Sequence, residues 1–424
     1  MKILIKNGRL VDPASATDAR RDIYIAAGKI AAIGSAPTGF TAERTIDASG
    51  LVVCPGLVDL SARLREPGFE YKATLESEMH AAIAGGVTSL ACPPDTDPPL
   101  DEPGLVEMLT FRARSLNLAR VHPVGALTAG LAGKRLTEMA ILRDAGCVAF
   151  SQADTPIEDT QVLWRAMQYA ATFDFPVWLR PSDGHFAKGG VAHDGVVAAR
   201  LGLAGIPALA ETVALATMLQ LARACGTRLH LCRLSTGEAV AMVRQAKADG
   251  VKVTCDVSAH HVHLSEMDLG YFDSHCHLIP PLRSLRDRDA LRAGVAEGVI
   301  DAICSDHTPV DEDAKQIPFG ESEGGATALE LLLPLTVKWA TETKQPLLAA
   351  LSAVTSRPAA ILGIDAGAIR VGGAADVAIF DAEEHVRITP ESLRSQGKNT
   401  PFLGYELPGR VRYTLVSGKV AHQS

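Results

Sequence analysis

The sequence predicts an α/β protein: a (β/α)8 barrel with a small β-sandwich formed by both ends of the chain. Between residues 54 and 363, short apolar β-type runs alternate with helical stretches. Eight such units imply a closed barrel of parallel strands. The two chain ends consist instead of β-type runs broken by glycine turns. The 424 residues suffice for a large barrel and one extra module.

The two ends of the chain are expected to join in one β-sandwich, with the barrel inserted between them. The first part covers residues 1–53, the barrel residues 54–363, and the second part residues 364–424. The β-type runs at the two ends are 3–11, 22–33, 45–53, 375–381 and 410–420. The pairs Asn7-Gly8, Gly28-Lys29 and Ser417-Gly418 are turn signals.

The barrel strands are predicted from apolar runs of five to seven residues. These runs are 54–60, 87–92, 120–126, 146–151, 176–180, 228–233, 252–258 and 301–305. Helical periodicity is clearest between Asp159 and Thr172, where Leu163, Met167 and Ala170 recur at i, i+4 and i+7. Because barrels of this type carry their active sites at the C-terminal ends of the strands, candidate residues are sought there.

Composition excludes several classes of protein. The net charge is −8 and no basic stripe is present, so nucleic acid is not an expected partner. No apolar run approaches the roughly 18 residues of a membrane helix, and the first residues lack the apolar core of a signal peptide. The eight cysteines are scattered without a Cys-x-x-Cys pair, which indicates reduced thiols and a cytoplasmic location.

Several motifs are specific enough to indicate a family. They are Pro55-Gly-Leu-Val-Asp59, Leu64-Arg-Glu-Pro-Gly68, Ala84-Gly-Gly-Val-Thr88, Pro280-Pro-Leu-Arg283, Ser305-Asp-His307 and Asn399-Thr-Pro-Phe-Leu-Gly404. With these motifs the chain resembles the dihydroorotase family of the amidohydrolase superfamily over nearly its whole length. The resemblance implies an amidohydrolase-type barrel that hydrolyses or closes a cyclic amide. It also implies one or two divalent metals, typically zinc, that activate a water molecule.

At the positions where this family has its metal ligands, the sequence departs from the family. The His-x-His of the first strand, the carboxylate of the fourth and the histidines of the fifth and sixth fall on Ser61, Arg63, Gln152, Arg180 and Arg233. Only the acid/base aspartate of the eighth strand is retained, as Asp306. A guanidinium has no lone pair to offer and stays charged, and a catalytic zinc typically has three protein ligands. We therefore expect no bound metal and an idle Asp306.

Of the substrate-binding positions that the resemblance implies, one matches the family and two do not. Arg65 matches the arginine that binds the substrate carboxylate in the family. Asp95 and Ile279 replace two asparagines, so one position would repel an anion and the other makes no hydrogen bond. His307 follows Asp306 and is interpreted as a neighbour in the motif rather than a ligand.

Three guanidiniums at one end of a barrel require anions nearby, because burying an unpaired charge is costly. The candidates are Asp306, Asp95, Asp183, a bound phosphate or an acidic segment of a partner, and we favour internal pairing with Asp306. His261 and His263 would share one face if they lay on a strand, with His260 beside them, but two ligands on one face are too few for a metal site. Ser61 has no evident histidine to activate it as a nucleophile.

Three hypotheses follow for the function. The favoured one is a dihydroorotase-like pseudoenzyme without a metal. The resemblance is strongest to non-catalytic members that assemble with aspartate carbamoyltransferase in pyrimidine (UMP) biosynthesis, which implies a homo- or hetero-oligomer. The alternative is an active dihydroorotase or related cyclic amidohydrolase with an atypical or metal-free site that uses Asp306. A third is an anion-binding sensor built on the arginines.

Overall fold

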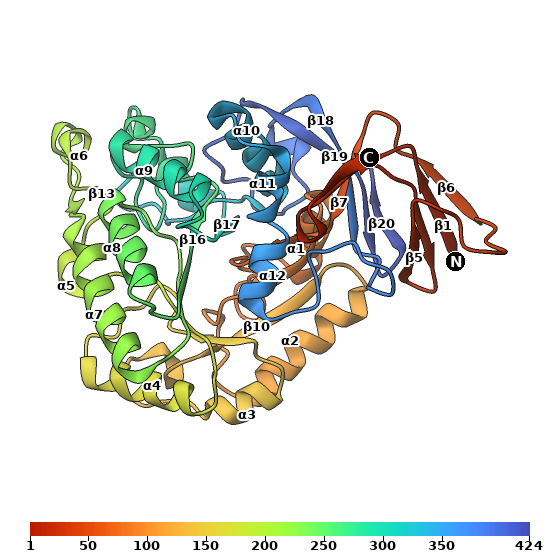
Figure 1. Ribbon diagram of the computed structural model, residues 1–424. Helices are drawn as coiled ribbons and strands as arrows, with labels where there is room; N and C mark the ends of the chain where they lie inside the picture. The colour runs from red at the N-terminus through yellow and green to blue at the C-terminus, as the bar shows by residue number, and fades with distance from the viewer.

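The computed structural model describes all residues, 1–424, and consists of a barrel and a β-sandwich. Barrel helices occupy most of the molecule in Figure 1, and the sandwich strands lie at one side together with both chain termini. The predicted fold class is thereby confirmed. No helix combines the length and the apolar character needed to cross a bilayer.

Eight parallel strands form the barrel, and each pairs with its neighbour in chain order. They are β8 (Leu57–Asp59), β9 (Val87–Cys92), β10 (Arg120–Ala126), β11 (Ala149–Ser151), β12 (Val177–Leu179), β15 (Leu229–Leu231), β16 (Val253–Ser258) and β17 (Ala302–Cys304). All eight predicted runs contain their strand. The first and last strands are joined by one isolated parallel bridge, Ala62 to His307, so the barrel is nearly closed.

The helices surround the strands. They are α1 (Leu75–Ala84), α2 (Pro103–Leu116), α3 (Met139–Asp144), α4 (Thr160–Thr172), α5 (Gly184–Ala187), α6 (Val196–Leu201), α7 (Leu209–Cys225), α8 (Gly237–Ala248), α9 (Leu285–Ala296), α10 (Leu332–Thr343), α11 (Leu347–Ser352) and α12 (Ser356–Leu362). A two-stranded sheet of β13 (Ala192–His193) and β14 (Gly205–Ile206) brackets α6.

The predicted helix at 159–172 is α4. It starts after Asp159, whose carboxylate accepts hydrogen bonds from the backbone N–H of Gln161 and Val162. Leu163, Met167 and Ala170 lie on its buried face, as the periodicity predicts.

The sandwich contains a four-stranded and a six-stranded sheet. The first has the order β5 (Lys29–Ile33), β4 (Ile23–Ala26), β1 (Lys2–Lys6), β6 (Arg44–Asp47). The second has the order β20 (Lys419–Gln423), β19 (Glu406–Val416), β18 (Val377–Arg387), β7 (Val52–Pro55), β2 (Arg9–Asp12), β3 (Thr17–Arg20). The two ends of the chain meet where β7 pairs with β18.

Three expectations about the strands were wrong in detail. The predicted turn at Asn7, which has φ +65°, divides the run 3–11 into two strands, but these strands belong to different sheets, which was not expected. The polar, half-exposed edge strand β3 was not predicted, since its residues lack an apolar pattern. Cys54 and Pro55, expected to begin the first barrel strand, pair with β18 instead, and the chain enters the barrel at Gly56.

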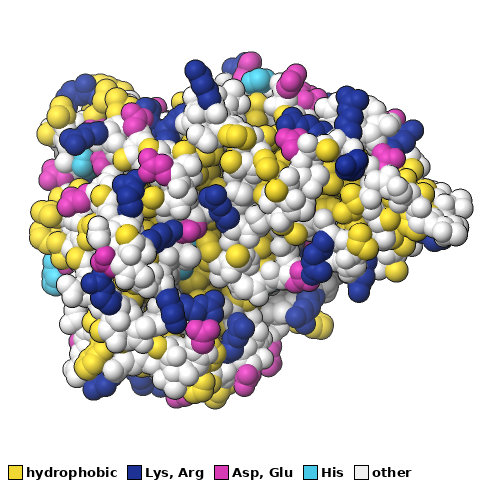
Figure 2. Space-filling view, viewed as in Figure 1, with side chains coloured by type: hydrophobic (Ala, Val, Ile, Leu, Met, Phe, Trp, Pro, Cys, Tyr) yellow, Lys and Arg dark blue, Asp and Glu magenta, His cyan; other side chains and the backbone are white.

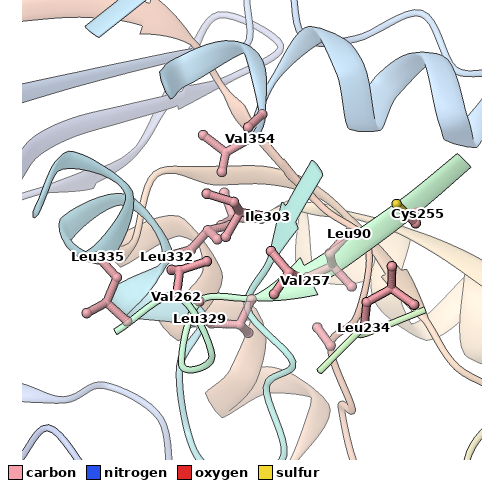
Figure 3. Close-up of a cluster of buried hydrophobic side chains, with 14 of the residues drawn as sticks. Leu90, Leu234, Cys255, Val257, Val262, Ile303, Leu329, Leu332, Leu335 and Val354 are labelled. Carbon is pink, nitrogen blue, oxygen red and sulfur yellow. The ribbon is translucent and has the colours of Figure 1, made fainter. Parts of the chain in front are cut away.

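The main core fills the space between the strands and the surrounding helices. Figure 3 shows part of it, where Leu90, Val257 and Ile303 of the strands meet Leu332 of α10 and Val354. A separate core lies between the sheets of the sandwich, and a small one lies inside the barrel. The core therefore holds the strand ends in place independently of any bound group.

We predict that Gly56→Ala destabilises the protein by about 1–3 kcal/mol, because the added Cβ would lie 2.2 Å from Oγ1 of the buried Thr88. Gly104→Ala, at an open position in α2, is the matched control and is expected to leave stability unchanged or slightly raised. Thermal unfolding of both variants measures the difference, and equal melting temperatures would contradict the proposed clash.

Candidate functional site

Five charged side chains meet at the C-terminal end of the barrel. Arg63 follows β8, Asp154 follows β11, Arg180 follows β12, Arg233 follows β15 and Asp306 follows β17. Arg63, Arg233 and Asp306 are almost fully buried, at 4–6% exposed. Because the strands of a barrel converge at this end, residues distant in sequence form one cluster, referred to below as the arginine network.

Asp154 is the shared anion of the arginine network. Its Oδ2 lies 2.6 Å from Nη2 of Arg63. Its Oδ1 lies 2.5 Å from Nε of Arg180 and 2.5 Å from Nη2 of Arg233. The backbone carbonyl of Asp154 also accepts from Nη2 of Arg180 at 3.0 Å. One residue thus engages three guanidiniums.

The other two carboxylates belong to Asp306 and to a sixth member of the network, Asp95. Oδ1 of Asp306 lies 2.9 Å from Nη1 of Arg233 and 3.5 Å from Nη1 of Arg63. Oδ2 of Asp95 accepts from Nε of Arg63 at 2.7 Å. The expected pairing with Asp306 is therefore present for Arg233 and Arg63, whereas Arg180 pairs with Asp154 alone. Three arginines and three aspartates balance in formal charge.

Asp154 was not among the candidate site residues predicted from the sequence, although it lies two residues beyond Gln152. The available signal was an acidic residue directly after the fourth barrel strand. Ala153, with φ +50°, precedes it at the bend after the strand, a conformation that apolar periodicity does not predict. Asp183 was expected as a possible counter-ion but instead caps α5, accepting from the N–H groups of His185 and Phe186.

The network favours the charged forms of Asp154 and Arg63, but it does not fully offset the effect of burial on Asp306. Burial by itself would raise the pKa of Asp154, but Arg233, Arg63 and Arg180 outweigh burial and hold that pKa well below its ordinary value. Burial opposes the charge of Arg63, yet Asp95 and Asp154 raise its pKa above the usual range. Burial raises the pKa of Asp306, and Arg233 and Arg63 offset this only in part.

The remaining positions that correspond to family ligands point elsewhere. The side chain of Gln152 donates to the carbonyl of Leu131 at 2.8 Å and accepts from Thr128 Oγ1 at 3.0 Å. The backbone carbonyl of Ser61 accepts from the N–H of His307 at 3.1 Å, and no hydrogen bond links the Ser61 hydroxyl to a histidine. Gln152 therefore stabilises a loop, and Ser61 has no base beside it.

The expected substrate positions have partners within the chain. Nε of Arg65 donates to the carbonyl of Pro309 at 2.8 Å, and its guanidinium lies over the ring of Phe69. His307 is fully buried, and its Nε2 contacts Oε2 of Glu78 at 2.6 Å. Ile279 is 40% exposed and offers only its carbonyl, which lies 3.4 Å from Nη1 of Arg233.

The histidines after the seventh barrel strand do not form a cluster. The sequence allowed His261 and His263 to share one face of a strand. Strand β16 ends at Ser258, however, so both histidines lie in a turn. Nδ1 of His261 pairs with Ser258 Oγ at 2.7 Å, and Nε2 of His263 with the carbonyl of Leu335 at 2.8 Å. His260 stacks on Phe402.

A group that the sequence analysis missed lies inside the barrel. Ligand atoms of His230, Cys232 and Asp256 lie within 4.8 Å of one another. Nε2 of His230 is already 2.9 Å from Oδ2 of Asp256, and its Nδ1 is 2.9 Å from Thr254 Oγ1. The other oxygen of Asp256 accepts from the backbone N–H of Arg233 at 2.7 Å. These contacts engage His230 and Asp256, and the bond from the Arg233 N–H links them to the arginine network.

The residues at the family's ligand positions do not fit a divalent metal. Three of them are guanidiniums, which repel a dication and have no lone pair to donate. Asp154 and Asp306 could coordinate a metal only by giving up the ion pairs that neutralise those guanidiniums. The network is chemically suited to hold charges in place, not to activate water.

Comparisons with known proteins find similarity to dihydroorotases and dihydroorotase-like proteins along the whole chain. Models described as dihydro-orotase-like and as amidohydrolase family match residues 50–239 and 204–422. A dihydroorotase-like protein of Pseudomonas aeruginosa is 47% identical over the full length of both chains, and one of Pseudomonas putida is 46% identical over 100% of this chain and 99% of the other. A dihydroorotase of Geobacter sp. is 39% identical over the full length of both chains.

Solved structures support the fold. An L-hydantoinase (dihydropyrimidinase) from Arthrobacter aurescens superposes with a TM-score of 0.88 at 24% sequence identity. The match covers 99% of this chain and 96% of the hydantoinase chain. A D-hydantoinase superposes with a TM-score of 0.84 at 23% sequence identity, and the match covers 100% of this chain and 96% of the hydantoinase chain.

We predict that Asp154→Asn destabilises the protein by about 3–5 kcal/mol, because it leaves buried guanidiniums without their shared anion. Asp95→Asn removes an ion pair to Arg63 alone and is expected to cost clearly less. Denaturant unfolding of both variants measures the difference. Equal losses would show that Asp154 is not the anion on which the network depends.

Proposed function

The chain belongs to the dihydroorotase family of the amidohydrolase superfamily, and we propose that it is a member without the metal cage whose role is structural. Specifically, we propose a subunit that supports aspartate carbamoyltransferase in pyrimidine biosynthesis. The observation that supports the loss of catalysis is the arginine network. The expectation of this partner comes from the resemblance to non-catalytic family members.

The chemistry of the family requires a metal that generates a nucleophile from water at neutral pH. In this chain the positions that would hold the metal are occupied by Arg63, Arg180 and Arg233, each engaged with a carboxylate. A metal-free reaction would depend on Asp306 alone and would forgo a contribution of several kcal/mol from metal activation. Asp306 is in addition held by Arg233 and Arg63. These constraints favour a protein that does not hydrolyse cyclic amides.

A structural role is compatible with the same observations. The core between strands and helices does not involve the arginine network, so the outer surface of the barrel can persist without the metal. The ion pairs substitute for metal coordination as links between strand ends. A scaffold needs only such a persistent surface. In the proposed complex, the outer surface of the barrel contacts the carbamoyltransferase chain.

We predict that protein purified without chelators contains far less than one zinc per chain and does not hydrolyse dihydroorotate above background, even with added zinc or manganese. Elemental analysis and a spectrophotometric hydrolysis assay provide the measurements, and Asp306→Asn is the control for contaminating enzyme. Stoichiometric zinc, or hydrolysis abolished in Asp306→Asn, would overturn the proposed loss of catalysis.

We predict that the chain forms a stable complex with the aspartate carbamoyltransferase chain of the same organism, and that carbamoyltransferase activity falls when it is omitted. Co-expression followed by native mass measurement gives the composition of the complex. Asp306→Asn should assemble like the wild type if it is folded, because a scaffold does not use the retained acid. Two chains that migrate separately, with full transferase activity in the absence of this chain, would exclude the scaffold role.

A further inference from the structure

A cavity lies at the N-terminal end of the barrel, away from the arginine network. It has a volume of about 520 Å³ and is lined by residues at the starts of β12, β15 and β16 and by the helix α12. Helix α12 crosses this face of the molecule in Figure 1, and Lys and Arg side chains lie around the hollow beside it in Figure 2. Nothing in the proposed function uses this end of the barrel.

The cavity lining is positively charged. Arg228, Lys252 and Arg357 contribute cations, and Asp301 is the one acidic residue of the lining. The carboxylate of Asp301 is already engaged, since its Oδ2 accepts from Lys247 Nζ at 2.7 Å and from the N–H of Cys255 at 2.8 Å. An excess of positive charge in a concave site favours an anionic ligand.

The cations of the lining are mostly free to bind. Arg228 donates to Oδ2 of the exposed Asp174 at 3.1 Å. Neither Lys252 nor Arg357 takes part in an ion pair, in contrast to every member of the arginine network. Two uncompensated cations therefore face one cavity.

A buried donor provides an independent indication of a ligand. Trp178 lines the same cavity, is 3% exposed, and its indole Nε1–H has no hydrogen-bond partner. Buried donors in folded proteins are almost always paired, so this N–H is suited to an acceptor that enters the cavity. An anionic oxygen would satisfy the indole and the cations together.

The rest of the lining is apolar. Pro176, Val251 and Ile361 contribute carbon surface beside the cations. We propose that this cavity binds a small organic oxyanion. Its charged oxygens contact Trp178 Nε1, Arg357 and Lys252, and its carbon body packs against Ile361 and Val251. This site does not depend on the proposed structural role, because it lies at the opposite end of the barrel from the arginine network.

The test follows the indole resonances of protein labelled with ¹⁵N-tryptophan during titration with phenyl phosphate. The chain has three tryptophans, and Trp339 is an internal control, since its Nε1 is also buried without a partner but lies outside the cavity. The Trp178 resonance is expected to shift saturably while that of Trp339 stays in place. Titration with benzoate distinguishes a preference for carboxylate from one for phosphate, and neutral phenol is expected to give no saturable shift.

Variants decide between this site and unspecific binding. Arg357→Gln is expected to weaken binding of phenyl phosphate about tenfold, the loss of roughly one charge-assisted hydrogen bond. Arg20→Gln, an arginine of the sandwich, is the matched control and should bind like the wild type. Trp178→Phe assigns the resonance, and if it fails to fold, Trp164→Phe and Trp339→Phe assign it by elimination. No saturable Trp178 shift with either anion, or equal affinity in Arg357→Gln, would overturn the proposal.

Discussion

The sharing of one carboxylate by three guanidiniums is the constraint on which the C-terminal end of this barrel depends. Asp154 lies within 2.6 Å of Arg63, Arg180 and Arg233, which follow three different strands. In a low-dielectric setting, an ion pair of this kind is favourable only when each partner is compensated. The ion pairs of Asp95 and Asp306 with these arginines provide that compensation.

The network also acts where the barrel is weakest. The first and last strands share one isolated backbone bridge, between Ala62 and His307. Arg63 follows the first strand and contacts Asp306, which follows the last. Asp59 of β8 accepts from the N–H of Ser305 at 2.8 Å beside the same junction. Side-chain contacts therefore complete a closure that the backbone leaves unfinished.

The fold could be predicted well because the information it needs is local. Each barrel strand is a short apolar run, and α4 carries both its cap at Asp159 and its buried stripe at Leu163, Met167 and Ala170. The polar edge strand β3 could not be predicted, since its pairing with β2 depends on tertiary contacts and not on its own pattern.

Most residues of the candidate site and the pairing with Asp306 could be predicted, but the shared anion Asp154 could not. The resemblance to the dihydroorotase family located Arg63, Arg180, Arg233 and Asp306, all of which reach the same end of the barrel. The role of Asp154 depends on a left-handed residue, Ala153, that redirects the chain after the strand. Trp178 and its cavity gave no signal at all, because a single tryptophan in an apolar run is indistinguishable from ordinary core.

Sharing Asp154 makes the present arrangement difficult to reverse one mutation at a time. Changing a single arginine to histidine would leave a negative charge in excess, while the two other guanidiniums would still exclude a dication. Each intermediate would lose stability before any ligand set became complete. Several replacements would therefore have to occur together before this end of the barrel could bind a divalent metal.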